Sequence, residues 1–203
     1  MTLTTLSESR SFGGVQRVVS HASTATGTIA KVTAGDFPGC CLFYKGRLYY
    51  ASTPLKGTKV WFSTSGVYDD FTIPSTLTDS SAFNFVIADI TQNIEWLYPG
   101  DNSLVAGATD GIVAINGGGV NTSITAASVQ ANKTSAEPTN GVYPIGKDGL
   151  IFYVGRTGRN MYYFKYDIIG ESFLAKDANL VAYDITLGGL TKLRAKRDRN
   201  DLI

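Results

Sequence analysis

The sequence has 203 residues, of which 43% are hydrophobic and 17% are charged, and its formal net charge at pH 7 is +1. The near balance of 18 Lys and Arg against 17 Asp and Glu excludes a protein that attracts DNA or an anionic membrane through its overall charge. No apolar run approaches the roughly 18 residues of a membrane helix, and the N-terminus lacks the pattern of a signal peptide. We therefore expect a soluble protein made in the cytoplasm, without membrane insertion.

The chain starts with a polar segment and continues into short strands. Residues 1–36 are rich in Ser and Thr, and we expect an arm or a strand contributed by an adjoining domain. From Phe37 on, Val, Ile, Thr, Tyr and Phe are interrupted by Gly, Asn, Asp and Ser at short intervals, which is typical of an all-β protein. The stretch 37–53, FPGCCLFYKGRLYYAST, predicts two strands joined at Lys45-Gly46.

This pattern recurs along the chain. A polar turn is followed by Leu and an apolar strand in KGRLYYAST, DNSLVAGATDG, KDGLIFYVGRTGR and, at the chain end, RNDLI. The shared positions are Leu48, Leu104, Leu150 and Leu202, which recur about every 50 residues. A lead-in strand precedes each turn, and a further strand follows each complete version. A unit of this length predicts a β-propeller blade, and the alternative is a β-sandwich with chance similarity among its hairpins.

We accordingly expect one β-propeller-like domain over residues 37–203, an array of three- to four-stranded antiparallel blades. It would hold about three blades and the start of a fourth, introduced by the lead-in strand GGLTKLRAKR. Excursions at 65–93 and 117–141, rich in Ser, Thr, Asn and Gly, separate the units and are expected to contact other chains. A closed propeller usually needs at least four blades, so the chain is expected to be a fragment or to be completed by partner chains.

Packing roles follow from residue type. We expect the tyrosines of these strands to fill the space between blades while their hydroxyls reach water or backbone. Gly107, Gly111 and Gly155 are expected at bulges or at close contacts between sheets. Cys40 and Cys41 are expected to be small buried residues, because adjacent strand side chains point to opposite faces and do not readily form a disulfide.

The residues needed for catalysis do not form a recognisable pattern. His21 is the single histidine and lies in a polar stretch. No nucleophile elbow, zinc-ligand spacing or phosphate-binding glycine motif is present, and most carboxylates lie in turns beside Gly or Asn. We therefore expect a protein that is not an enzyme, with no catalytic residues, no cofactor and no metal.

Two basic stretches are the candidate functional residues. GRTGRN places Arg156 and Arg159 in a glycine hairpin, and TKLRAKRDR places Lys192, Arg194 and Lys196 at alternate positions of an expected strand, hence on one face. One interpretation is a solvated outer face with nearby carboxylates. The other is a positive stripe that faces a polyanion or a channel, or a neighbouring subunit.

The serial order of the motifs resembles the tail nozzle, or tail-tube B-type, proteins of short-tailed bacteriophages. The stretches that carry the resemblance are FPGCCLFYKGRLYYAST, VWFSTSGVYDDF, FNFVIADITQNIEWLYPGDNSLVAGATDGIVAI, GKDGLIFYVGRTGRNMYYFKYD and DITLGGLTKLRAKRDRNDLI. They cover most of residues 37–203. Gly155-Arg156 and Gly158-Arg159 match the arginine-bearing hairpin of that family, and the chain stops where the family continues into further strands.

The resemblance implies a structural virion protein of the phage tail, synthesised in the host cytoplasm. It implies a homo-oligomer, a hexameric ring around the channel through which DNA leaves, with other phage tail proteins as partners and non-specific contact with the DNA. The alternative function is a carbohydrate-binding or glycan-cleaving β-propeller for host recognition. In that case Tyr49, Trp61 and Trp96 would be the platforms that stack on sugars.

Overall fold

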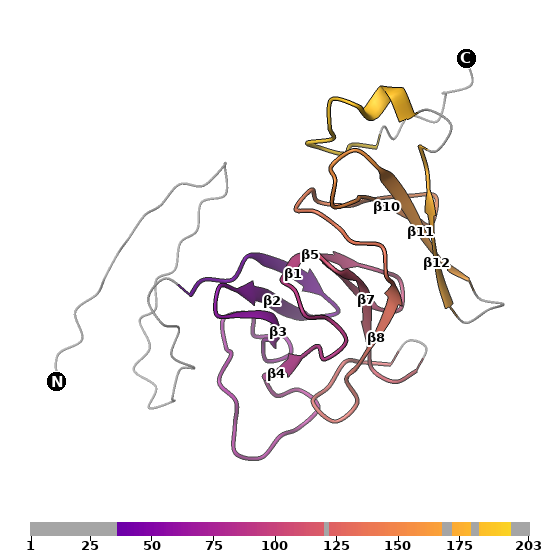
Figure 1. Ribbon diagram of the computed structural model, residues 1–203. Helices are drawn as coiled ribbons and strands as arrows, with labels where there is room; N and C mark the ends of the chain where they lie inside the picture. The colour runs from indigo at the N-terminus through magenta and orange to yellow at the C-terminus, as the bar shows by residue number, and fades with distance from the viewer. Residues whose placement is uncertain (1–35, 120–121, 168–171, 180–182, 196–203) are drawn as a thin grey trace.

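The computed structural model describes residues 36–119, 122–167, 172–179 and 183–195. The fold is all-β, with three four-stranded antiparallel sheets in a propeller-like arrangement, as the sequence predicted (Figure 1). The first sheet consists of β1 (Cys40–Tyr44), β2 (Arg47–Thr53), β3 (Lys56–Phe62) and β4 (Phe83–Val86). The second consists of β5 (Ile94–Pro99), β6 (Leu104–Ala108), β7 (Gly111–Asn116) and β8 (Gln130–Ser135). The third consists of β9 (Ile145–Lys147), β10 (Leu150–Val154), β11 (Met161–Asp167) and β12 (Ser172–Asp177).

Each sheet is a meander in which every strand pairs with the next one in the chain. Leu48, Leu104 and Leu150 lie at or next to the start of the second strand of their sheets, so the predicted recurrence is confirmed for three units. Leu202 lies outside the described residues. The Lys45-Gly46 turn has φ angles of 42° and 74°, which is the left-handed conformation of a tight two-residue hairpin. Asp148-Gly149, with φ angles of 54° and 74°, repeats this turn in the third sheet.

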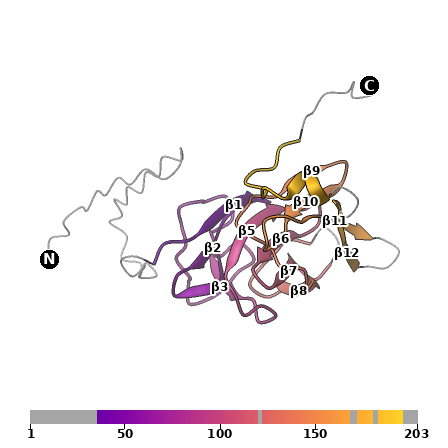
Figure 2. The same ribbon diagram turned by 45° about the horizontal axis from the view of Figure 1, so that its top comes forward.

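The three sheets pack face to face in chain order (Figure 1, Figure 2). Strand β1 contacts β5, and β8 contacts β12, so equivalent ends of the meanders lie together. The second sheet is buried on both sides, and β6 shows how: Leu104 and Ala106 pack in the cluster shared with the first sheet, whereas Val105 packs in the cluster shared with the third. The apolar character of β6 on both faces therefore reflects its central position. The described residues contribute three sheets and do not form a closed propeller.

Two of the predicted glycine positions are set by aromatic rings on the neighbouring strand. Gly107 pairs with Trp96, and a Cβ atom at Gly107 would lie 2.1 Å from an indole carbon. A Cβ atom at Gly155 would lie 2.7 Å from the Tyr162 ring. At Gly111, φ is 150° and a Cβ atom would lie 2.4 Å from the Ser135 carbonyl oxygen, next to a register shift. The expectation of a bulge is confirmed next to Gly111, whereas the close contacts at Gly107 and Gly155 are with strands of the same sheet, so the expectation of contacts between sheets is wrong at these two positions.

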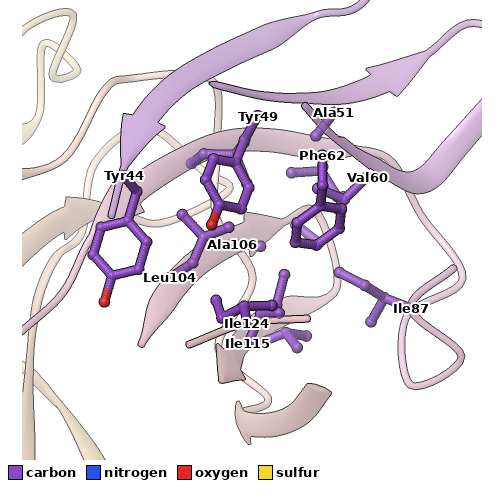
Figure 3. Packing of buried hydrophobic residues seen from close by; sticks show 14 of the residues in the cluster. Tyr44, Tyr49, Ala51, Val60, Phe62, Ile87, Leu104, Ala106, Ile115 and Ile124 are labelled. Carbon is purple, nitrogen blue, oxygen red and sulfur yellow. The ribbon is translucent and has the colours of Figure 1, made fainter. Parts of the chain in front are cut away.

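The tyrosines of the first hairpin are packing residues, as predicted. Tyr44, Tyr49 and Phe62 lie side by side between the first two sheets, and the Tyr49 and Phe62 ring centroids are 4.9 Å apart (Figure 3). The expectation that such hydroxyls reach water or backbone is wrong for Tyr44 and Tyr153. Both hydroxyls are buried without a hydrogen-bond partner among the described residues, and both rings pack in the apolar layers between the sheets.

The expectation for the two cysteines is half correct. Both are free thiols, and they lie on opposite faces of β1. Cys40 is partly buried and packs against the first cluster, whereas Cys41 is exposed on the outer face of the first sheet. The prediction that Cys41 is buried is wrong, because the described residues provide no layer over its position.

The excursions return to their own sheets. Strand β4 lies within residues 65–93 and β8 within 117–141, so the first and second sheets each gain a fourth strand that the repeating pattern of three strands did not show.

The first excursion is held by Arg47, which is only 4% exposed. Its guanidinium donates to the Ser63 and Ser81 carbonyl oxygens at 2.5 and 2.9 Å and also to the Asp79 carbonyl oxygen.

The predicted lead-in strand of a fourth unit is wrong as far as the structure describes it. Residues 188–195 contain no strand, and a short 3-10 helix, η1 (Tyr183–Thr186), precedes them. Gly189 turns the chain with φ of 84°, and the Leu190 amide donates to the Gly158 carbonyl oxygen at 2.6 Å. No neighbouring strand is present among the described residues to satisfy a further ladder, so the backbone bonds to the hairpin turn instead.

Residues 1–35 and the RNDLI stretch at 199–203 lie outside the described residues, and so do the predictions made for them. Among the residues described, no helix has the length and apolar composition needed to cross a membrane.

Candidate basic surface

The arginine-bearing hairpin joins β10 to β11 through residues 155–160. The Gly155 amide donates to the Asn160 carbonyl oxygen at 2.8 Å, and the Gly158 amide donates to the Gly155 carbonyl oxygen at 2.9 Å. Gly158 has φ of 74°, a conformation that glycine adopts without strain. This closed turn leaves the side chains of Arg156 and Arg159 exposed, so the predicted hairpin is confirmed.

A buried asparagine fixes this hairpin to the chain that follows β12. Asn179 is 6% exposed, and its amide nitrogen donates to the Arg159 carbonyl oxygen at 3.2 Å and to the Thr186 hydroxyl at 2.7 Å. Its amide oxygen accepts a bond from the Met161 backbone amide at 2.9 Å. One side chain thus connects the hairpin, the start of β11 and η1, which restricts the backbone that carries Arg159.

The second basic stretch lies against the same hairpin. The Leu190 amide donates to the Gly158 carbonyl oxygen in the turn that carries the arginines, and Lys192 follows two residues after Leu190. Lys192 and Arg194 are exposed, but the segment is not a strand, so the expectation that alternate positions share one strand face is wrong for these two residues. Lys196 lies outside the described residues.

These four basic side chains have no acidic partner among the described residues. Arg156, Arg159, Lys192 and Arg194 are all exposed, and none of them forms an ion pair with another described residue. Exposed guanidinium and ammonium groups of this kind contact phosphate or carboxylate groups at little desolvation cost. The structure therefore brings the two predicted basic stretches to the same end of the third sheet.

The outer face of the third sheet carries further basic residues that the sequence analysis missed. Phe152 pairs with Tyr163, and Tyr163 pairs with Lys176, so these three share a face. Lys165 lies two residues from Tyr163, and Lys147 pairs with the residue two positions before Phe152, which places both on that face too. The three lysines are exposed around an aromatic pair whose centroids are 6.2 Å apart. The period of two within β11 could have indicated part of this set.

An open groove of about 590 Å³ lies between β5, β9 and the C-terminal segment. Tyr98 and Tyr143 lie on one side, with ring centroids 6.1 Å apart, and Lys192 and Leu193 line it as well. Tyr143 is 54% exposed, and burial, followed by Tyr98 and the two cysteines, raises the pKa of its hydroxyl. At neutral pH the groove thus offers an aromatic surface, neutral hydroxyl groups and one ammonium group.

Two of the three aromatic residues expected to bind sugars are buried. Tyr49 and Trp96 are 1% and 2% exposed, because they fill the layers on either side of the second sheet, so neither can stack on a sugar in solution. Trp61 is partly buried, and the Lys59 ammonium group lies 5.4 Å from its ring centroid. The prediction of these platforms is wrong for Tyr49 and Trp96.

No group of three or more His, Cys, Asp or Glu side chains within the described ranges is placed to hold a metal ion, and His21 lies outside those ranges. No protein-family model matches the chain, and no curated protein matches it either. The basic surface, the groove and the arrangement of the sheets are therefore the observations that bear on function.

Proposed function

We propose that this chain is a structural virion protein, a propeller-like wall segment of the tail nozzle of a short-tailed bacteriophage. In this role copies of the chain form a ring around the DNA exit channel and contact other tail proteins. The observation that carries the proposal is the serial stacking of three meander sheets with β1 against β5 and β8 against β12. Sheets stacked in this way form a stiff wall that further sheets or subunits can extend.

The outer face of the first sheet supports an assembled state. Phe43 is 63% exposed and Val86 is 55% exposed on this face. Phe43 packs edge to face with the Tyr68 ring, with the centroids 5.1 Å apart, and Tyr68 is itself 45% exposed. Phe43 and Val86 lie on the opposite edge strands β1 and β4, so exposed apolar side chains occur at both edges of this face, and large exposed apolar side chains are frequent at interaction surfaces. We infer that a neighbouring subunit or a further sheet covers them.

The basic surface supports contact with DNA. A channel protein needs a strip of positive side chains and not a high total charge, which is consistent with a net charge of +1. Arg156, Arg159, Lys192 and Arg194 provide exposed charges at one end of the third sheet. Phosphate contacts of this kind are independent of DNA sequence and weaken with salt.

The assembly is tested on the purified full chain by sedimentation and negative-stain electron microscopy. A ring with several copies is expected, and a stable monomer of 21.7 kDa at micromolar concentration would contradict the proposal. DNA contact is tested by titrating a DNA duplex at several salt concentrations. Replacing both Arg156 and Arg159 by Ala should reduce the slope of log K against log [salt] by about 2, while the control Lys133→Ala on β8 leaves it unchanged.

The alternative function, a carbohydrate-binding or glycan-cleaving protein, is supported by the groove that contains Tyr98 and Tyr143. An exposed ring beside a second aromatic ring offers a surface for a sugar. In this case the monomer binds a glycan in a saturable way, and Tyr143→Ala abolishes the binding while Tyr68→Ala does not. Ring formation without such binding favours the nozzle.

A further inference from the structure

We propose that a small oxyanion, a phosphate or carboxylate group, binds in a pocket where the two excursions meet the first hairpin. The pocket has a volume of about 300 Å³, at the lower end of the range for small-ligand sites. Lys45, Arg47 and Tyr49 line it from the hairpin, Asp79 from the first excursion and Thr125 from the second. This site goes beyond the role in a ring, since it requires only a folded chain.

The pocket contains a buried cation that has no negative partner among the described residues. Arg47 is 4% exposed, and the acceptors of its guanidinium are three backbone carbonyl oxygens, of Ser63, Asp79 and Ser81. No carboxylate of the described residues forms an ion pair with it. Carbonyl oxygens stabilise a cation but do not cancel its charge, and guanidinium remains protonated at any physiological pH. The uncompensated charge therefore favours an anion at the pocket.

A second polar side chain, that of Tyr49, lines the same pocket. Tyr49 is 1% exposed, and its hydroxyl forms no hydrogen bond with a described residue. Burial raises the pKa of this hydroxyl, so it stays protonated and remains a donor. The Tyr49 hydroxyl oxygen is not among the fully buried polar atoms that lack a partner, so it keeps access to the pocket and can donate a hydrogen bond to a ligand oxygen there. The geometry thus supplies a directional donor next to a positive charge.

The rim adds one positive and one negative group. Lys45 is exposed in the hairpin turn, where its ammonium group lies 5.4 Å from the Tyr44 ring centroid. Asp79 contributes the one carboxylate that lines the pocket, and it forms no ion pair with Lys45. Two cations and one carboxylate leave the pocket positive. An oxyanion is the ligand class that uses both this charge and the Tyr49 donor.

The test is isothermal titration calorimetry on the full chain with inorganic phosphate, glucuronate and glucose as probes. We expect saturable binding of phosphate or glucuronate, one per chain, and no binding of the neutral sugar. Tighter binding of phosphate indicates a phosphate-bearing ligand, and tighter binding of glucuronate indicates an acidic sugar.

The variants Lys45→Asn and Tyr49→Phe should each weaken the preferred anion about tenfold. Asn tolerates the left-handed turn at position 45, and Phe preserves the packing at position 49, so both variants should fold. The matched controls are Lys165→Asn, an exposed lysine of the third sheet, and Tyr153→Phe, a buried hydroxyl outside the pocket, and both should bind as the original chain does. Absence of anion binding, equal binding of glucose, or unchanged affinity in Lys45→Asn and Tyr49→Phe would overturn the site. These outcomes do not depend on whether the chain forms a ring.

Discussion

Replacing Gly107 by Ala tests the packing between the second and third sheets. The added Cβ atom would lie 2.1, 2.2 and 2.7 Å from three carbon atoms of the Trp96 indole, whereas ordinary contact begins at 3.4 Å. Trp96 is 2% exposed and packs against Tyr153, with ring centroids 6.2 Å apart, so the indole has little room to move. Overpacking of this severity costs about 3 kcal/mol, at the upper end of the usual range.

A smaller effect acts in the opposite direction. Gly107 does not have a left-handed φ, so Ala is not strained there, and it stabilises by less than about 1 kcal/mol because it restricts the unfolded chain. The net loss is about 2 kcal/mol, which lowers the midpoint of urea unfolding by about 1 M. Far-UV circular dichroism measures this without relying on Trp96. The control Gly188→Ala, at a site with open space and no left-handed φ, should shift the midpoint little.

A double-mutant cycle identifies the cause. Trp96→Phe creates space beside position 107, so the double variant Trp96→Phe/Gly107→Ala should be more stable than additive costs predict, by about 1 kcal/mol or more. If Gly107→Ala unfolds at the midpoint of the original chain, or if the two costs are additive, the indole does not set this position and the reasoning fails.

Three further predictions concern the first sheet. Arg47→Met removes the bonds to three carbonyl oxygens and should destabilise the chain by about 4 kcal/mol, with faster proteolysis at 64–82; a loss no larger than that of the control Lys56→Met would contradict this. A thiol reagent at pH 8 should label only Cys41, because burial raises the pKa of Cys40 to about 12 and suppresses its thiolate; labelling of both thiols before unfolding argues against the packing. The free energy of unfolding should be constant up to about pH 9 and fall between pH 9 and 12. The reason is that burial raises the pKa of Cys40 from 9.0 to about 12 and the pKa of Tyr44 from 10.0 to about 12. Raised values mean that the folded chain holds these protons more tightly, so alkali favours unfolding; Cys40→Ala should reduce the loss, and a stability that rises in this window would refute the assignment.

The sequence by itself determined the three repeating units, because the interactions that define them are local. The turns at Lys45-Gly46 and Asp148-Gly149 need left-handed φ angles, and the apolar residues after them lie on adjacent strands of a meander. The exposed hairpin with Arg156 and Arg159 was predicted on the same basis, since a glycine turn between paired strands projects from the sheet.

Only the tertiary structure decided which faces are covered. A strand that is apolar on both sides looks the same in sequence wherever it lies in a stack, so nothing local distinguished the buried Tyr49 and Trp96 from exposed platforms, or placed Cys41 at the surface. The return of the first excursion depends on Arg47, whose bond to Ser81 spans 34 residues of the chain. Such bonds and the stacking of sheets join residues far apart in the chain, and no periodicity records them.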